Sequence, residues 1–273
     1  MKKTIFVAQP LYSRTVHYGA AEAFLKASKT CRMVNKTDGS SLLARNFNLL
    51  FCHALEWRDR GQADYFAMIH GDVVPPVWWA DVMIAEMERV GADVLSAVVP
   101  LKSEHGLTST AIDRVALTDL ELAGDLAGDG GGYEVEDCTH FWAVERRLTM
   151  TEVMGLPITF GAADVCPGHA LLVNTGLFVC NLHRNWYDND DFCFTIRDRI
   201  VRERQDGRVV KRTVQCVPED WHFSREVQRH GGKVMATRIV PLFHDHERYN
   251  NHSAWGEWSW DKEFADSPLR VST

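Results

Sequence analysis

Several hallmarks of common protein classes are missing from this chain of 273 residues. Its seven cysteines are scattered and form no Cys-x-x-Cys pair, which argues against a zinc ribbon and a disulfide framework and indicates a reducing compartment. No apolar run is long enough to span a bilayer. The apolar stretch after the basic start Lys2-Lys3 ends at Gln9-Pro10, too early for a signal peptide. We therefore expect a cytoplasmic protein with no membrane partner.

Two further absences concern phosphate and nucleic acid. The glycine-rich stretch Asp125–Tyr133 is not followed by Lys-Ser or Lys-Thr, so it is not a phosphate-binding P-loop. A formal net charge of -7 argues against a globally basic nucleic-acid-binding protein, although a local basic groove is compatible with it. The stretch Arg197–Arg212 is such a local excess, with seven basic against three acidic side chains, and Asp206-Gly207 within it predicts a hairpin turn.

What is present is the composition of a globular protein, 45% hydrophobic and 25% charged. In the first hundred residues, β-rich runs alternate with helical stretches. The expected strands are Thr4–Ala8 (closed by Pro10), Met33–Val34, Tyr65–Ile69 and Val94–Val99, and the expected helices are Tyr18–Ser28, Leu42–Arg58 and Trp78–Val90. This alternation predicts an α/β fold, Rossmann-like, with a mostly parallel central sheet between helices.

The second half continues the pattern less regularly. Leu171–Cys180 is predicted as two short strands that meet near Gly176, Glu219–His230 as a helix, and Lys233–Val240 as a strand. No linker or internal repeat divides the chain, so a single domain over residues 1–273 is expected. Ligands of open sheets bind beyond the carboxyl ends of the strands, which here carry Gln9-Pro10, His70-Gly71-Asp72 and Pro100-Leu101-Lys102.

Asp72 is the most informative of these strand-end residues. It follows the apolar run Tyr65–Ile69 almost directly and precedes Pro75-Pro76. A carboxylate at the end of a buried strand stands in a cleft, where a divalent cation can bind its oxygens and a phosphate-bearing substrate can complete the shell. The alternative is a turn residue with no further role.

Four motifs stand in a characteristic order. They are Ile5-Phe6-Val7-Ala8-Gln9-Pro10-Leu11-Tyr12, then Ser41-Leu42-Leu43-Ala44-Arg45-Asn46, then His70-Gly71-Asp72, and finally Pro218-Glu219-Asp220-Trp221-His222-Phe223 with Gly231-Gly232-Lys233-Val234 after it. Together they resemble the GT-A glycosyltransferases, especially the family 2-like enzymes that many phages encode. The resemblance covers residues 4–102 and 170–246. One departure is His70, which replaces the first acid of the family's Asp-x-Asp motif.

The resemblance implies a GT-A-like domain whose residues 1–102 bind the nucleotide and whose residues 103–273 form the acceptor side with a smaller antiparallel sheet. It implies a divalent metal, Mn or Mg, held by Asp72 and by His244 or His246 in the segment Leu242–His246. The metal would neutralise the leaving diphosphate of a nucleotide sugar, most simply a UDP-sugar. An enzyme of a phage would act in the host cytoplasm.

The resemblance also implies roles for the Glu219-Asp220 pair and for donor contacts. Asp220 would be the general base of an inverting transfer and Glu219 its neighbour that positions hydroxyl groups; two acids at a helix start can also serve only the helix dipole. The donor side would comprise Pro10, Tyr12, Arg14, Arg45, Asn46, His70, Asp72, Lys102 and Gly176, whose lack of a side chain would let the sugar approach.

The acceptor stays open at this point. Trp221 and His222 are its candidate contacts. The basic stretch Arg197–Arg212 suits a phosphate backbone, and an enzyme that adds sugar to a hydroxymethylated base in phage DNA would need such a stretch. The many aromatic side chains suit a glycan or saccharide equally, and the basic stretch is alternatively a solvated hairpin. Two rivals remain. A nucleotidyltransferase would need a glycine-rich, basic sequence near the first strand, which Gln9–Tyr12 does not provide, and a non-catalytic protein would bind nucleotide sugar or glycan without turnover.

Overall fold

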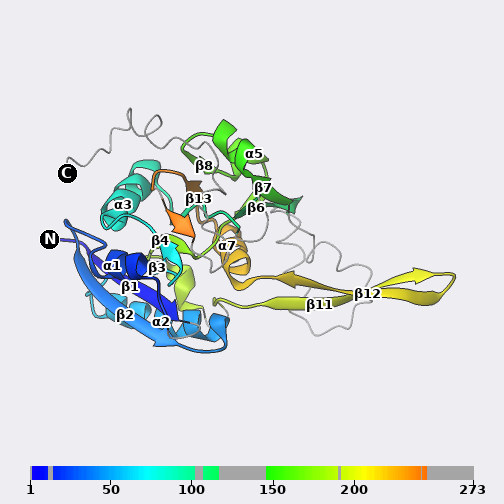
Figure 1. Cartoon of the computed structure of the whole chain (residues 1–273), viewed down its shortest axis with the longest axis horizontal. Coiled ribbons are helices and arrows are strands. Elements are labelled where there is room, and N and C mark those ends of the chain that lie inside the picture. Colours follow the sequence, from blue (N-terminus) through cyan, green and yellow to red (C-terminus); the bar gives the residue numbers. More distant parts are fainter. Residues whose placement is uncertain are drawn as a thin grey trace.

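The computed structural model describes residues 2–11, 15–101, 107–116, 146–189, 192–240 and 242–244. Its centre is a seven-stranded mixed sheet, and most of its strands run in one direction (Figure 1). The strand order is β2 (Arg32–Gly39), β1 (Thr4–Leu11), β3 (Tyr65–Ile69), β10 (Leu177–Asn181), β5 (Val94–Ala97), β13 (Val234–Thr237) and β8 (Thr159–Gly161). Only β10 and β8 run against their neighbours.

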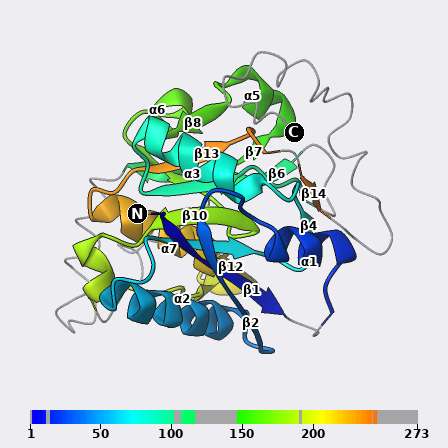
Figure 2. The ribbon, with the colours of Figure 1, turned by 90° about the vertical axis from the view of Figure 1, so that its left-hand side faces the viewer.

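Helices cover both faces of this sheet (Figure 2). On one face, α1 (Tyr18–Leu25) and α3 (Trp79–Val90) pack against Ile5 and Val7 of β1. On the other, Phe6 belongs to a core cluster that also contains buried side chains of α2 (Leu43–Asp59) and α7 (Glu219–Arg229). Successive side chains of β1 therefore point into two different apolar cores, as expected for a strand inside a layered α/β fold. The prediction of a mostly parallel sheet flanked by helices is confirmed.

Within the part of the chain that the structure describes, three small antiparallel sheets accompany the central one. The first contains β7 (Arg146–Thr149), β6 (Leu107–Ala116) and β9 (His169–Leu172), and α5 (Met150–Gly155) and α6 (Ala162–Val165) lie beside it. The second pairs β4 (Val73–Val74) with β14 (Phe243–His244). The third is the long hairpin β11 (Arg197–Gln205) and β12 (Arg208–Val217), which follows the short 3-10 turn η2 (Asn185–Asp188) and turns at Asp206-Gly207 as predicted.

Several element ends differ from the sequence prediction: β13, for example, covers Val234–Thr237 of the predicted strand Lys233–Val240. Three further differences have a clear physical reason. First, β1 continues through Pro10 to Leu11, because it has a neighbour on only one side beyond Ala8 and every other N–H of a strand points away from that neighbour. Second, β2 is eight residues long, since it pairs with β1 along its whole length.

Third, α1 ends at Leu25, three residues before the predicted end at Ser28. Asp81 of α3 accepts hydrogen bonds from the Ser28 hydroxyl and from the backbone N–H groups of Lys29 and Thr30. These bonds hold residues 28–30 as a turn, which a helix could not accommodate.

The six described cysteines form no disulfide with one another. Within the described ranges, no helix combines the length and the apolar character needed to cross a membrane.

Candidate active site

Asp72 and His244 come together although 171 positions separate them in the sequence. Asp72 lies between β3 and β4, and His244 lies on β14, where it pairs with Val73 across the two-stranded sheet. The Asp72 Oδ2 and His244 Nε2 atoms are 3.6 Å apart, with side-chain exposures of 43% and 18%. The pairing of β14 with β4 thus brings an imidazole to the carboxylate at the carboxyl end of β3.

The orientation of the His244 ring follows from its second nitrogen. Nδ1 lies 2.8 Å from the carbonyl oxygen of Pro100. A carbonyl only accepts, so Nδ1 carries the proton, and in the neutral ring Nε2 presents its lone pair toward Asp72. A lone pair and a carboxylate that face each other are stabilised by positive charge. Either a proton on Nε2 or a metal ion bound to both groups can supply it.

This donor set fits a divalent metal. Carboxylate oxygen is the ligand that Mg²⁺ and Mn²⁺ prefer, and imidazole suits Mn²⁺ and the later transition metals. Ligands at about 2.1 Å from one ion can lie up to about 4 Å apart, so both side chains can contact the same cation. No group of three or more His, Cys, Asp or Glu side chains with metal-site geometry occurs among the described residues. The remaining ligands would have to come from substrate and water.

His70 stands at the end of β3, two residues before Asp72, and is partly buried. Its Nε2 lies 3.2 Å from the Thr175 hydroxyl, and its backbone N–H donates to the Gly176 carbonyl. A Cβ added to Gly176 would lie 2.9 Å from the Asn174 amide oxygen, so the missing side chain makes room for protein atoms. Its predicted contact with a sugar stays a prediction.

Helix α7 is attached to β9 and the residue after it through side chains. Ser224 accepts from the backbone N–H of Val173, and Gln228 both accepts from and donates to the backbone of Leu171. Only Asn174 separates Val173 from Thr175, which contacts His70. One short segment, residues 171–175, thus connects α7, which begins with the predicted catalytic acids, to His70 at the end of β3.

The acids at the start of α7 occupy an environment that disfavours their charge. Burial, reinforced by the nearby charge of Glu219, raises the pKa of Asp220 to about 7. The N–H of Trp221 donates to Asp220 Oδ1 over 2.8 Å and offsets this only in part. Burial also raises the pKa of Glu219. A carboxyl group that is half ionised near neutral pH can both accept and release a proton.

Trp221 and His222, the predicted acceptor contacts, are buried. The Trp221 indole donates to the Ser109 carbonyl, and the guanidinium of Arg147 lies over its ring at 4.5 Å. Burial lowers the pKa of His222 to about 4. Both side chains pack inside the protein here, and their contact with an acceptor stays a prediction.

The predicted donor residues are placed unevenly. Pro10 is buried in β1, and Arg45 is exposed in the first turn of α2. Asn46 is fully buried and donates to the Asp38 carbonyl, so it ties α2 to the end of β2. Tyr12, Arg14, Lys102 and His246 lie outside the described residues.

Sequence reasoning missed several residues that shape this region. A buried ion pair joins Arg225 of α7 to Asp113 of β6, with Nε and Oδ2 2.6 Å apart. Thr175 and Ser224, which position His70 and α7, were also not singled out. The helical spacing of Ser224 and Gln228 was visible in the sequence, but their partner strand was not.

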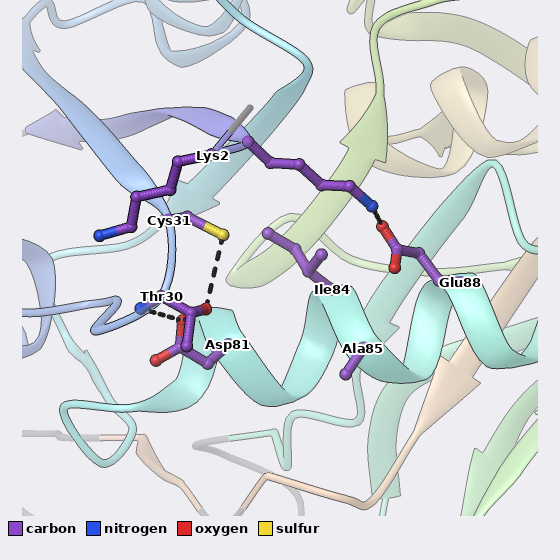
Figure 3. Close-up of a pocket in the computed structure, with 8 residues that line it drawn as sticks. Lys2, Thr30, Cys31, Asp81, Ile84, Ala85 and Glu88 are labelled. Atoms are coloured by element: carbon purple, nitrogen blue, oxygen red, sulfur yellow. Dashed lines mark hydrogen bonds and ion pairs between the residues drawn. The ribbon is translucent and has the colours of Figure 1, made fainter.

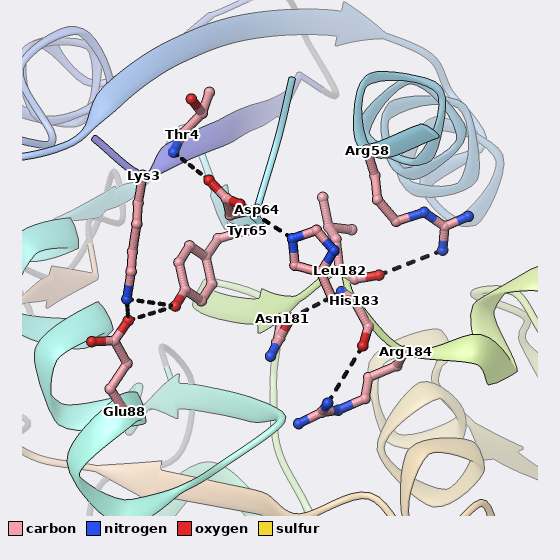
Figure 4. Close-up of polar contacts among 10 residues, drawn as sticks. All are labelled: Lys3, Thr4, Arg58, Asp64, Tyr65, Glu88, Asn181, Leu182, His183 and Arg184. Atoms are coloured by element: carbon pink, nitrogen blue, oxygen red, sulfur yellow. Dashed lines mark hydrogen bonds and ion pairs between the residues drawn. The ribbon is translucent and has the colours of Figure 1, made fainter. Parts of the chain in front are cut away.

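A pocket at the opposite, amino-terminal end of the strands has a different character (Figure 3). It is lined by Lys2, Lys3, Thr30, Cys31, Asp81, Ile84, Ala85 and Glu88. Its polar groups already have partners, since Lys3 pairs with Glu88 and Thr30 donates to Asp81. Polar groups nearby are also paired with one another: Asp64 contacts both Thr4 and His183 (Figure 4).

The fold class, a mixed α/β protein with a large, mostly parallel sheet, comes from the structure itself, and comparison with known proteins adds nothing to it. No family model matches the chain, and no curated protein does. Among solved structures, the chain is similar to the protein described as A197 from STIV, with 13% sequence identity, a TM-score of 0.45, and coverage of 90% of this chain and 86% of that one. A likeness at this level assigns neither a family nor an activity.

Proposed function

We propose that this chain is a metal-dependent glycosyltransferase that moves a sugar from a nucleotide-sugar donor, a UDP-sugar, to a hydroxyl acceptor. The observation that carries the proposal is the Asp72–His244 pair, whose Oδ2 and Nε2 atoms are 3.6 Å apart. Asp72 is the strand-end acid of the motif that resembles Asp-x-Asp. An Mn²⁺ or Mg²⁺ ion held there would neutralise the diphosphate as it leaves.

Asp220 supports the chemical half of the proposal. Transfer to a hydroxyl group requires that the hydroxyl proton be accepted as the new bond to the anomeric carbon forms. With a pKa of about 7, the Asp220 carboxylate can accept that proton at neutral pH, and Glu219 beside it can hold hydroxyl groups of sugar or acceptor. A base that acts on the acceptor from the face opposite the leaving diphosphate gives inversion.

The test measures thermal stability and donor hydrolysis in parallel. UDP with Mn²⁺ should raise the melting temperature of the wild-type chain, because a ligand of the folded state stabilises it by mass action. Asp72→Asn should weaken Mn²⁺ binding by at least about tenfold to a hundredfold. Asp59→Asn, the same change at a carboxylate that is 63% exposed, is the matched control and should bind as wild type.

Three results separate this proposal from its rivals. Slow, Mn²⁺-dependent hydrolysis of a UDP-sugar that Asp72→Asn abolishes supports a transferase. Binding of the sugar nucleotide with no hydrolysis would identify a binding protein instead. Turnover that persists undiminished in excess chelator would remove the metal from the proposal.

A further inference from the structure

The β11–β12 hairpin is a long two-stranded element with few contacts to the rest of the described structure. It extends away from the body beyond α7 (Figure 1) and pairs with no third strand among the described residues. At nine and ten residues, its strands reach about 30 Å. An isolated two-stranded hairpin is only marginally stable in water, because it has no apolar face to bury. A partner that binds along it would supply the missing stabilisation.

The outer part of the hairpin is basic. Arg202, Arg204, Arg208 and Arg212 have exposed side chains, and none of the four forms an ion pair with a described acidic group. The whole chain carries a formal net charge of -7, so this positive surface is opposite in sign to the charge of the rest of the chain. Clustered arginines on one element are the electrostatic signature of a phosphate-binding surface.

One pair within this cluster points to an anion directly. Arg202 and Arg212 are cross-strand partners in the ladder, so both side chains leave the same face of the ribbon. Like charges placed directly opposite each other destabilise a hairpin. A phosphate group between two guanidinium groups converts this repulsion into two charge-assisted hydrogen bonds.

We propose that the β11–β12 hairpin is a binding arm for double-stranded DNA. A two-stranded β-ribbon fits the major groove of a B-form duplex, and arginines along it reach the phosphates on either side. The register shift at Glu203/Arg204 adds local twist, which suits a ribbon that follows a groove.

The base of the arm leads directly to the candidate catalytic acids. Val217 ends β12, Pro218 follows, and Glu219 and Asp220 open α7. A duplex held along the arm therefore lies beside Asp220. This refines the proposed function, on which it rests for one point only: the bound DNA is the acceptor, and the hydroxyl group that receives the sugar belongs to it.

The test measures binding of a fluorescent duplex of about 25 base pairs to the full chain by anisotropy, over about 50–200 mM salt. With four arginines on phosphates, the logarithm of the association constant should fall with that of salt with a slope of about -3.6. Arg202→Gln/Arg212→Gln should lower affinity at least about tenfold and make the slope less steep by about 2. Arg204→Gln/Arg208→Gln, which changes two arginines near the tip of the hairpin, should lower the affinity and the salt slope by similar amounts.

The matched control removes two positive charges from the body. Lys26→Gln/Arg60→Gln changes two exposed side chains, 64% and 61% accessible, and should leave binding within about twofold of wild type. The inference is overturned if the wild-type chain binds no duplex, if the control weakens binding as much as the hairpin variants, or if a sulfated polysaccharide binds at least as tightly as the duplex.

Hydrolysis of a UDP-sugar without acceptor separates this inference from the proposed function. Both hairpin variants should retain wild-type hydrolysis, since neither changes a residue of the donor site. Hairpin-dependent DNA binding without any hydrolysis would overturn the proposed function and leave the arm standing. Hydrolysis without DNA binding would overturn the arm and leave the proposed function standing.

Discussion

The two ends of the central sheet shift the pKa of a carboxyl group in opposite directions. At the amino-terminal end, Asp81 is partly buried, which by itself raises its pKa, yet hydrogen bonds from Lys29, Ser28 and Thr30 hold the pKa below its ordinary value. At the carboxyl-terminal end, the pKa of Asp220 is about 7, because burial and the charge of Glu219 outweigh the hydrogen bond from Trp221.

Other acids at the amino-terminal end also accept several hydrogen bonds. Asp93 accepts from the Arg184 guanidinium and from the Lys233 backbone N–H, and Asp64 ties the starts of β1 and β3 to His183 (Figure 4). Carboxylates with this many donors hold strands in place. A carboxylate whose ionised form is disfavoured weakens the fold at neutral pH, and perturbation of this kind gathers at functional sites. If this contrast holds, substitutions at the two ends of the sheet should have effects of very different size.

Asp220→Asn should reduce sugar transfer by about 10²–10⁴-fold, the usual contribution of a general base, with the KM for the donor little changed. In the wild type, kcat should rise with pH through a midpoint near 7, where Asp220 ionises, and the variant should lack this midpoint. Steady-state kinetics between pH 5 and 9 measure both quantities. Near-normal turnover in the variant would place the base elsewhere.

Arg225→Met should lower the free energy of unfolding by about 3–5 kcal/mol, because it removes the guanidinium that pairs with the fully buried Asp113 carboxylate. Urea denaturation at pH 7 gives the value. The double variant Arg225→Met/Asp113→Leu should recover much of the loss, since it removes both charges. A loss below about 1 kcal/mol in the single variant would mean that this pair does not hold α7 to β6.

The pH dependence of stability should carry the signature of Asp220. Its pKa is about 7 in the folded state and about 4 in the unfolded chain, so the folded state binds more protons between these values. Stability therefore falls as pH rises from about 4 to 7, by at most about 4 kcal/mol for this group. Unfolding free energies at pH 5 and 8 should differ less in Asp220→Asn than in wild type; equal differences would contradict the raised pKa.

Lys3→Met should change stability by less than about 1 kcal/mol and leave activity unaltered. The Lys3–Glu88 pair lies at the amino-terminal end with side chains 47% and 42% exposed, and exposed ion pairs contribute little. Thermal unfolding and donor hydrolysis measure the two effects. A large loss of activity would show that the amino-terminal end of the sheet also contributes to activity.

Much of the fold was predictable because local patterns determine it. The apolar run Tyr65–Ile69 is strand β3 as predicted, the helix predicted over Leu42–Arg58 is observed at Leu43–Asp59, and Asp206-Gly207 turns the hairpin. In each case the signal lies within the segment itself: a short apolar run, a helical spacing of apolar residues, or a turn dipeptide with both residues at positive φ.

Sheet order was not predictable in the same way. The alternation of the first hundred residues predicted a mostly parallel sheet but no strand order, and β10 lies between β3 and β5 in the opposite direction. The identity of a strand's neighbour depends on packing across more than a hundred positions, which no local pattern encodes. The pairing of His244 with Asp72 came from the resemblance, and the β4–β14 ladder supplies its physical basis.

The attachment of α7 to β9 has a consequence for the behaviour of the protein in solution. β9 is the last strand of its small sheet, and the backbone groups of such a strand can recruit a strand from another molecule. Ser224 and Gln228 occupy the groups of Val173 and Leu171 that would do so. The helix that begins with the candidate catalytic acids thereby also covers an edge at which another molecule could pair.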